Sequence, residues 1–178
     1  MKPDHTALWA AVPEDRRWKY AHCERERRFL LSGDPGVPEI AAPTDILDKY
    51  LTGTNIRLRK AASGQIVEYK FQKKLRLRPG HTDQLWNSTI YISKAEYELF
   101  LPTPGIFLQK RRTFVAGDEG EKISIDRIEI AGDTFWIAEV EFDSEEAMNA
   151  YAFGLPYSQE ITNVPGFSGA EFAARQAL

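Results

Sequence analysis

The chain has 178 residues, 43% of them hydrophobic and 12% aromatic, with a formal net charge of -3 at pH 7. This length fits one domain with a sizeable core, and the balanced charge excludes the basic surface of a general nucleic-acid-binding protein. Cys23 is the only cysteine, which excludes an intramolecular disulfide and a cysteine-rich zinc site. Because no apolar run could span a bilayer and the first residues lack a secretion signal, we expect a cytoplasmic protein without a membrane partner.

The amino-terminal part divides into a tail and a first strand. Residues 1–17 carry several charges without a sustained period, so we expect a flexible tail there and a folded domain over 18–178. The first strand is predicted from about 18 to 31, before a cluster of turn-forming residues. Side chains alternate faces along a strand, so Glu24, Glu26 and Arg28 share one face. That face suits a wet, ligand-filled space, although an ordinary solvated strand face would carry the same residues.

A hairpin follows the first strand. Its predicted strands are Asp45 to Leu51 and Ile56 to Arg59, and a turn at Thr52 to Asn55 joins them. In the second strand Arg57 and Arg59 share one face, and apolar side chains take the other. The hairpin therefore predicts a sheet that is apolar outside and charged inside.

The middle of the chain adds two strands and a helix. Ile66 to Lys73 alternates in the same way and places Lys70 on the charged face, whereas the next strand, Trp86 to Ile92, is uncharged. The sequence Ser-Lys-Ala-Glu that begins at Ser93 is a capping box, which predicts a helix to about Leu101.

The last third contains three more predicted strands and a helix. Asp143 and Glu146 cap a helix predicted from about Ser144 to Phe153, and the tail after it ends in a short apolar-polar segment, Ala170 to Ala177. The strands bring further charges to one face: Lys110 and Arg112 from Ile106 to Val115, Asp126 from Ile123 to Asp126, and Glu139 and Glu141 from Phe135 to Phe142.

These elements predict an α+β fold that is mainly β. A sheet with one charged face either lies open to water or closes around a ligand, and closure explains more of the pattern. We therefore expect an eight-stranded antiparallel closed tunnel or barrel with a few flanking helices. Its inward face would gather Glu24, Glu26, Asp126, Glu139 and Glu141 beside Arg28, Arg57, Arg59, Lys70, Lys110 and Arg112.

The predicted lumen combines side chains that bind metal ions with side chains that bind phosphate. Carboxylates suit a hard cation such as Mg²⁺ or Mn²⁺, which prefers oxygen ligands and commonly keeps water and phosphate oxygens. Arginine and lysine suit the phosphates themselves. Acids beside bases therefore indicate a metal-polyphosphate site. The chain has neither a Gly-x-x-x-x-Gly-Lys-Ser/Thr loop nor a Gly-x-Gly-x-x-Gly motif, so phosphate binding would not use a helix amino terminus.

The ordered series of motifs resembles the CYTH superfamily of triphosphate tunnel metalloenzymes. The family signature Glu-x-Glu-x-Lys on the first strand is matched by Glu24 and Glu26, with Arg28 in the lysine position. The resemblance extends from Tyr20 to Ala174 and continues through Tyr50 to Thr54, Arg57-x-Arg59, Lys110-x-Arg112, Asp126, Ala138 to Phe142 and Glu160 to Asn163.

The resemblance implies a tunnel enzyme that uses Mg²⁺ or Mn²⁺ to hydrolyse triphosphates, either inorganic tripolyphosphate or an organic triphosphate. The expected partner is this small-molecule substrate, and the expected assembly is a monomer or homodimer. By resemblance, Glu24, Glu26, Glu139 and Glu141 are catalytic residues that bind metal or orient the attacking water, Asp126 joins them as a metal ligand, and Arg28, Arg57, Arg59, Lys70, Lys110 and Arg112 bind the substrate.

Two other functions stay open. The same superfamily includes class IV adenylyl cyclases, which require a nucleotide pocket that the sequence does not locate. A polyphosphate- or nucleotide-binding module with little turnover would use the same lumen. Arg28 in the lysine position favours the binding module, as does the uncharged strand Trp86 to Ile92, where many family members carry acids and a base.

Overall fold

The computed structural model describes residues 20–76 and 83–177. The predicted tail, residues 1–17, and the predicted start of the first strand lie outside this part of the chain. The strands are β1 (His22–Leu31), β2 (Thr44–Leu51), β3 (Ile56–Ser63), β4 (Ile66–Arg76), β5 (Gln84–Ile92), β6 (Gly105–Ala116), β7 (Lys122–Ile130), β8 (Asp133–Phe142) and β9 (Tyr157–Glu160), and the helices are α3 (Lys94–Phe100), α4 (Glu145–Ala150) and α5 (Gly169–Gln176).

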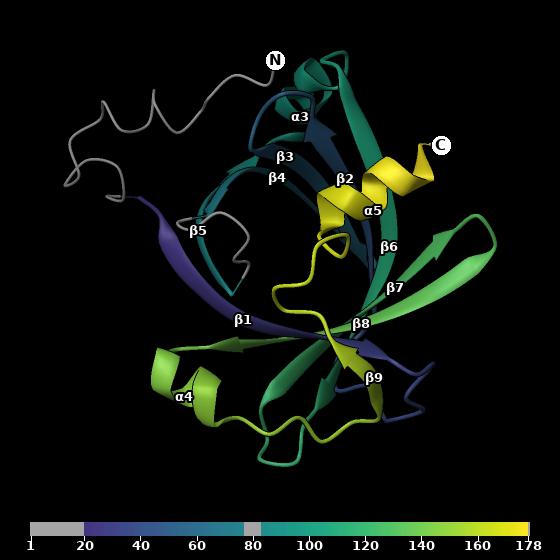
Figure 1. Cartoon of the computed structure of the whole chain (residues 1–178). Coiled ribbons are helices and arrows are strands. Elements are labelled where there is room, and N and C mark those ends of the chain that lie inside the picture. Colours follow the sequence, from purple (N-terminus) through teal and green to yellow (C-terminus); the bar gives the residue numbers. More distant parts are fainter. Residues whose placement is uncertain (1–19, 77–82, 178) are drawn as a thin grey trace.

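Eight of the described strands close into an antiparallel barrel, which confirms the predicted fold. Neighbours pair in the order β5-β4-β3-β2-β6-β7-β8-β1, and a further pairing of β1 with β5 closes the ring (Figure 1). The short strand β9 pairs with β1 from Phe29 to Leu31, beyond the part of β1 that pairs with β5. The sequence analysis missed β9 because its four residues lie in a tail without an alternating pattern.

Alternation gives the barrel a charged inner face and an apolar outer face. On the outer face of β1, β7 and β8, the side chains of Phe29, Ile125 and Val140 are fully buried in a core cluster. The segment after α4 covers this cluster, where Phe153 stacks on Phe29 with ring centroids 3.9 Å apart. Because the apolar residues of these strands pack outward, the charged residues between them face the lumen.

Both predicted helices form, but one is shorter than expected. α3 follows the predicted capping box and buries Tyr97 against the outer face of the barrel. α4 begins after Ser144 and ends at Ala150 rather than at Phe153. The predicted length was wrong because Tyr151 has extended backbone and packs with the core cluster instead. None of the helices within the described ranges has the length and apolar character needed to cross a membrane.

Helix α5 packs against one part of the inner face at one end of the barrel. In Figure 1 it lies in front of the ring of strands, and its Phe172 packs in an apolar cluster with Leu108 and Ile137 from the inner faces of β6 and β8. Its first residue, Gly169, approaches the barrel so closely that a Cβ there would lie 2.1 Å from the hydroxyl oxygen of Tyr50. The sequence predicted only a short apolar-polar segment at this position. The part of the inner face that α5 covers is therefore apolar, and the charged residues lie beyond it.

Candidate active site

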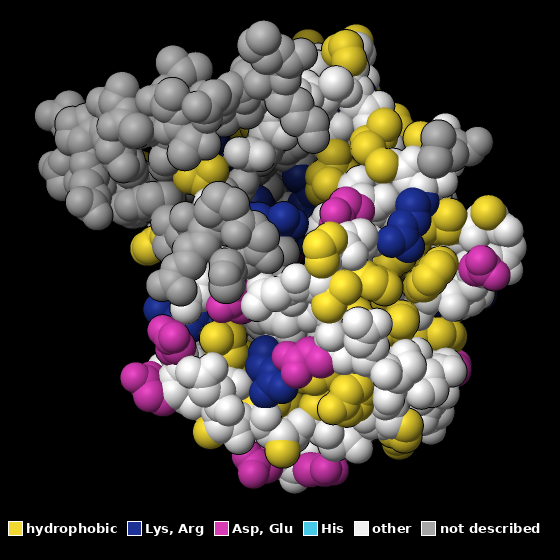
Figure 2. Space-filling view, in the orientation of Figure 1, with side chains coloured by type: hydrophobic (Ala, Val, Ile, Leu, Met, Phe, Trp, Pro, Cys, Tyr) yellow, Lys and Arg dark blue, Asp and Glu magenta, His cyan; other side chains and the backbone are white. Residues whose placement is uncertain are grey.

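The predicted charged residues come together on the inner face of the barrel. Register pairs place them side by side, as with Arg28 beside Glu139 and Arg112 beside Asp126. Figure 2 shows basic side chains at the bottom of a recess in the surface. The predicted residues on this face are Glu24, Glu26 and Arg28 from β1, Arg57 and Arg59 from β3, Lys70 from β4, Lys110 and Arg112 from β6, Asp126 from β7, and Glu139 and Glu141 from β8.

The centre of the site is a network of ion pairs between β1, β6, β7 and β8. Asp126, which is 2% exposed, accepts hydrogen bonds from Arg112 at 2.6 and 2.7 Å and a further one from Lys110. Arg112 also donates to Glu139, which accepts a second hydrogen bond from Arg28 Nε at 3.1 Å. Charged groups with so little exposure stay charged because their partners compensate for the lost water. The network thus holds bases and acids together in one buried layer.

Burial and neighbouring charges shift the pKa values in this layer. Burial raises the pKa of Glu26 to about 7, and the negative charge of Glu139 adds to the effect. Burial also acts on Glu139, but Arg112 and Lys110 outweigh it and hold the pKa of that carboxyl well below its usual value. Burial lowers the pKa of Lys110 to about 8, against the opposing charge of Asp126. Shifted values of this kind cluster at functional sites, where neighbouring carboxyls are set to different protonation states.

A second network, which the sequence analysis missed, holds the two arginines of β3. Asp48 is fully buried and accepts hydrogen bonds from Arg59 at 2.6 and 2.7 Å. Arg57 lies 3.5 Å from the same carboxylate and also donates to the side-chain oxygen of Gln72. Burial would raise the pKa of Asp48, but Arg57 and Arg59 outweigh it and hold that pKa well below its usual value. The alternation of Asp48 with Tyr50 in β2 is the signal that could have placed it on the charged face.

Glu24 is held at the seam where β1 meets β5. Its two oxygens accept hydrogen bonds from Lys74 Nζ and from Asn87 Nδ2, each at 2.6 Å. Lys74 belongs to the basic run of β4, but an exposed edge strand would show the same run. Asn87 lies in the uncharged strand β5, so no pattern in the sequence indicated it.

Two predicted residues take no part in these networks. Lys70 pairs with Glu68 at 2.9 Å, and its ammonium nitrogen lies 4.8 Å from the centre of the Tyr91 ring. Glu141 is exposed, and in the described part of the chain it makes no ion pair or side-chain hydrogen bond. Both residues lie on the inner face, but their predicted roles rest on the resemblance alone.

Arg28 connects the site to the segment that leads into α5. Its Nε donates to Glu139, and its Nη1 donates to the backbone carbonyl of Phe167 at 2.8 Å. A lysine, whose donors all sit on one nitrogen, lacks the planar fork that reaches these two acceptors from separate nitrogens. Arginine in the position of the family lysine therefore has a structural use in this chain.

Arg28→Lys is expected to lower the free energy of unfolding by about 1–2 kcal/mol, because one buried acceptor loses its charged donor. Urea denaturation followed by tryptophan fluorescence measures this change. Arg111→Lys is the matched control, since that side chain is 50% exposed and pairs with the exposed Asp45. Equal effects of the two substitutions would show that Arg28 does not anchor the segment before α5.

The carboxylates of the inner face suit a divalent metal ion that binds together with phosphate. Glu26 lies 4.0 Å from Arg28 and is paired in register with Glu141 on the neighbouring strand. Over the described ranges, no group of three or more His, Cys, Asp or Glu side chains forms a ready metal cage. Mg²⁺ is commonly held by one or two carboxylates, while water and substrate phosphates complete its shell. The residues present therefore fit a metal ion that the substrate helps to hold.

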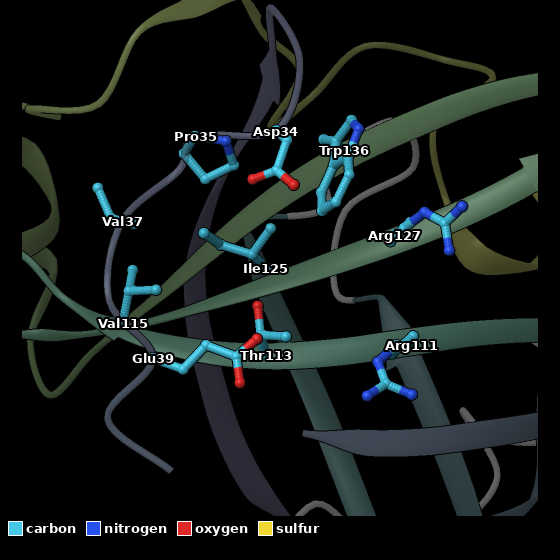
Figure 3. A pocket seen from close by; sticks show the side chains of 10 residues that line it. All are labelled: Asp34, Pro35, Val37, Glu39, Arg111, Thr113, Val115, Ile125, Arg127 and Trp136. Carbon is cyan, nitrogen blue, oxygen red and sulfur yellow. The ribbon is translucent and has the colours of Figure 1, made fainter. Parts of the chain in front are cut away.

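A separate pocket lies on the outer face of the barrel. It has a volume of about 430 Å³, and Trp136, Arg111 and Arg127 are among the side chains that line it (Figure 3). None of the predicted site residues lines this pocket. This pocket is therefore separate from the candidate active site on the inner face.

Comparison with solved structures gives the same fold. No model of a protein family matches the chain, and no curated protein matches its sequence. The inorganic triphosphatase NE1496 has a TM-score of 0.56 and 22% identity, with 84% of this chain and 93% of that chain covered. The PH1819 protein from Pyrococcus horikoshii OT3 has a TM-score of 0.52 and 15% identity, with 71% of this chain and 82% of that chain covered.

A candidate adenylate cyclase from Bacillus halodurans has a TM-score of 0.50 and 15% identity, with 84% of this chain and 100% of that chain covered. The barrel thus has a fold that is shared by proteins named as a triphosphatase and as an adenylate cyclase. These matches confirm the predicted tunnel fold.

Proposed function

We propose that the chain is a divalent-metal-dependent triphosphatase, which hydrolyses the terminal phosphoanhydride bond of inorganic tripolyphosphate or of an organic triphosphate. The observation that carries this proposal is the buried layer in which Arg28, Lys110 and Arg112 meet Asp126 and Glu139 on the inner face of a closed barrel. The fold shared with an inorganic triphosphatase supports it.

A triphosphate would bind by an exchange of ionic partners. Without substrate, the bases are neutralised by the acids, as Arg112 is by Asp126 and Glu139. Phosphate oxygens offer a guanidinium group the same bidentate contact as a carboxylate does, and a metal ion offers the acids a replacement cation. The anion and the metal are therefore expected to bind together more tightly than either does alone.

The basic and acidic side chains of the site would have different roles in the reaction. The arginines and lysines hold the phosphoryl oxygens and stabilise the negative charge that develops as the bond breaks. The carboxylates bind the metal ion or orient the attacking water. A bound Mg²⁺ or Mn²⁺ would supply Lewis-acid polarisation of the phosphate oxygens.

The purified protein is expected to release phosphate from tripolyphosphate, and this release is expected to stop when a chelator removes the divalent metal. The measurement compares tripolyphosphate, ATP, thiamine triphosphate and pyrophosphate in parallel, each with Mg²⁺, Mn²⁺ or chelator. Pyrophosphate is the matched control, because it shares the phosphoanhydride bond but offers one phosphoryl group fewer to the row of bases. If the folded protein releases phosphate from none of these substrates, the proposed hydrolase activity is refuted.

The two other functions give different results in the same assay. Cyclic AMP formed from ATP without phosphate release would identify a cyclase. Tight tripolyphosphate binding without turnover under any divalent metal would identify a binding module. The inner face of β5 is the observation that favours the binding module, because the side chains that contact its neighbours there, Asn87, Thr89 and Tyr91, are uncharged.

A further inference from the structure

The connection between β1 and β2, residues 32–43, forms one wall of the pocket on the outer face. On one side of the ring β8, β7 and β6 separate β1 from β2, and the connection passes over these strands. Val37 packs there on the core cluster, and Glu39 forms a bridge with Val115 near the end of β6. The cavity between the connection and the strands has a volume of about 430 Å³ (Figure 3). This volume is in the range of small-molecule sites, about 300–1,000 Å³.

The strands carry two arginines and a tryptophan on their side of the cavity. Arg111 of β6, Arg127 of β7 and Trp136 of β8 are successive cross-strand partners on the outer face. Cross-strand partners have Cβ atoms about 4.5–5.5 Å apart, and like charges at this spacing destabilise a sheet. The acids that pair with the two arginines, Asp45 and Glu129, are exposed, so they compensate little for the repulsion. An anionic group in the cavity would compensate for it.

The connection carries the opposite charge on its side of the cavity. Asp34 and Glu39 line the cavity from this segment, and Figure 3 shows them on either side of Ile125. One oxygen of Asp34 accepts the backbone N–H of Gly36 at 2.9 Å, which fixes the position of this carboxylate. Within residues 20–76 and 83–177, no ion pair joins either of these acids to the two arginines of the cavity. Opposite charges therefore line the same cavity without pairing across it.

The floor of the cavity between these charges is apolar. Val115 and Ile125 are 2% and 1% exposed, and Val37 and Trp136 pack against the core cluster to which both belong. An apolar floor offers no partner for a charge, but burying an apolar group on it is favourable. A ligand that matches the cavity therefore has three parts: an anionic group for the arginines, a cationic group for the carboxylates and an apolar group for the floor.

We propose that this cavity is a binding site for a zwitterionic α-amino acid with an apolar or aromatic side chain, a molecule that carries these three groups on one carbon atom. Its carboxylate pairs with Arg111 and Arg127, because guanidinium groups bind carboxylates through paired, charge-assisted hydrogen bonds. Its ammonium group pairs with Asp34 and Glu39, and its side chain lies on the apolar floor. The cavity is separate from the inner face of the barrel, so this inference does not depend on the proposed function.

Isothermal titration calorimetry with L-phenylalanine tests the inference, together with two analogues that each lack one charge. Phenylpropionate lacks the ammonium group and phenethylamine lacks the carboxylate, so each is expected to bind about 10-fold more weakly than phenylalanine. Glu39→Gln is expected to weaken the binding of phenylalanine about 10-fold but not that of phenylpropionate. Arg127→Gln is expected to weaken the binding of phenylalanine to a similar extent but not that of phenethylamine.

Glu98→Gln is the matched control for Glu39→Gln, because Glu98 lies on α3 away from the cavity and its side chain is 54% exposed. This variant is expected to bind phenylalanine as the wild type does. The inference is overturned if the wild type binds neither L-phenylalanine nor L-leucine. It is also overturned if phenylpropionate or phenethylamine binds as tightly as phenylalanine, or if Glu98→Gln and Glu39→Gln lose the same affinity for phenylalanine.

Discussion

Glu139→Gln is expected to lower the rate of tripolyphosphate hydrolysis about 10²–10³-fold, as for loss of one electrostatic contact in an active site. Glutamine keeps the shape of the side chain but removes the negative charge that Arg28 and Arg112 share. The two guanidinium groups then repel each other, and one of them loses its acceptor because glutamine keeps a single side-chain oxygen. Metal-dependent phosphate release at saturating substrate measures the effect.

Glu141→Gln is expected to lower turnover by a similar factor at ordinary metal concentrations, but for a different reason. This substitution removes a carboxylate that stands opposite Glu26 and leaves the arginines in place. Excess Mn²⁺ is therefore expected to restore part of the activity of Glu141→Gln and none of that of Glu139→Gln. Glu129→Gln is the control, because Glu129 is 61% exposed and pairs with Arg127 outside the lumen. Wild-type phosphate release by both site variants would show that the active site is wrongly assigned.

Asp48→Asn is expected to lower the free energy of unfolding by about 3–5 kcal/mol, the usual effect of breaking a buried ion pair by removing one partner. The change leaves Arg59 and Arg57 buried without their shared negative charge. Tripolyphosphate is expected to raise the melting temperature of this variant more than that of the wild type, because its phosphates replace the missing charge. Thermal unfolding with and without the anion measures both effects.

The control for Asp48→Asn lies three residues earlier on the same strand. Asp45 forms an exposed pair with Arg111, with side chains 65% and 50% exposed, and pairs of that kind contribute about 0–1 kcal/mol. Asp45→Asn is therefore expected to change stability little. Similar losses of stability in the two variants would mean that the buried network around Asp48 does not stabilise the barrel.

The alternation of charges along the strands made the barrel and most of the candidate site predictable from the sequence. A period of two in β1, β3, β6 and β8 is enough to assign faces, and Glu24, Arg57, Lys110 and Glu139 were placed on the inner face by it. The turns between the strands supplied the rest of the fold. Both signals are local, so they can be recognised in the sequence without knowledge of tertiary contacts.

The remaining features depend on partners far away in the chain. Asp48 gains its importance from Arg59 on the next strand, and Asn87 from Glu24, which lies 63 residues earlier. The sequence of α5 looks like an ordinary short segment. Its position depends on the apolar surface that the inner-face side chains of β6 and β8 provide for Phe172. The length of α4 was misjudged because tertiary packing of Tyr151 overrides helix propensity.

The position of α5 has a consequence for where a phosphate chain would lie in the proposed enzyme. Phe172 packs against Leu108 and Ile137 and so covers part of the inner face with apolar side chains. An anionic chain would find no charged partner on that surface. It would therefore bind along the basic side chains alone, and their extent would set how many phosphoryl groups the lumen holds.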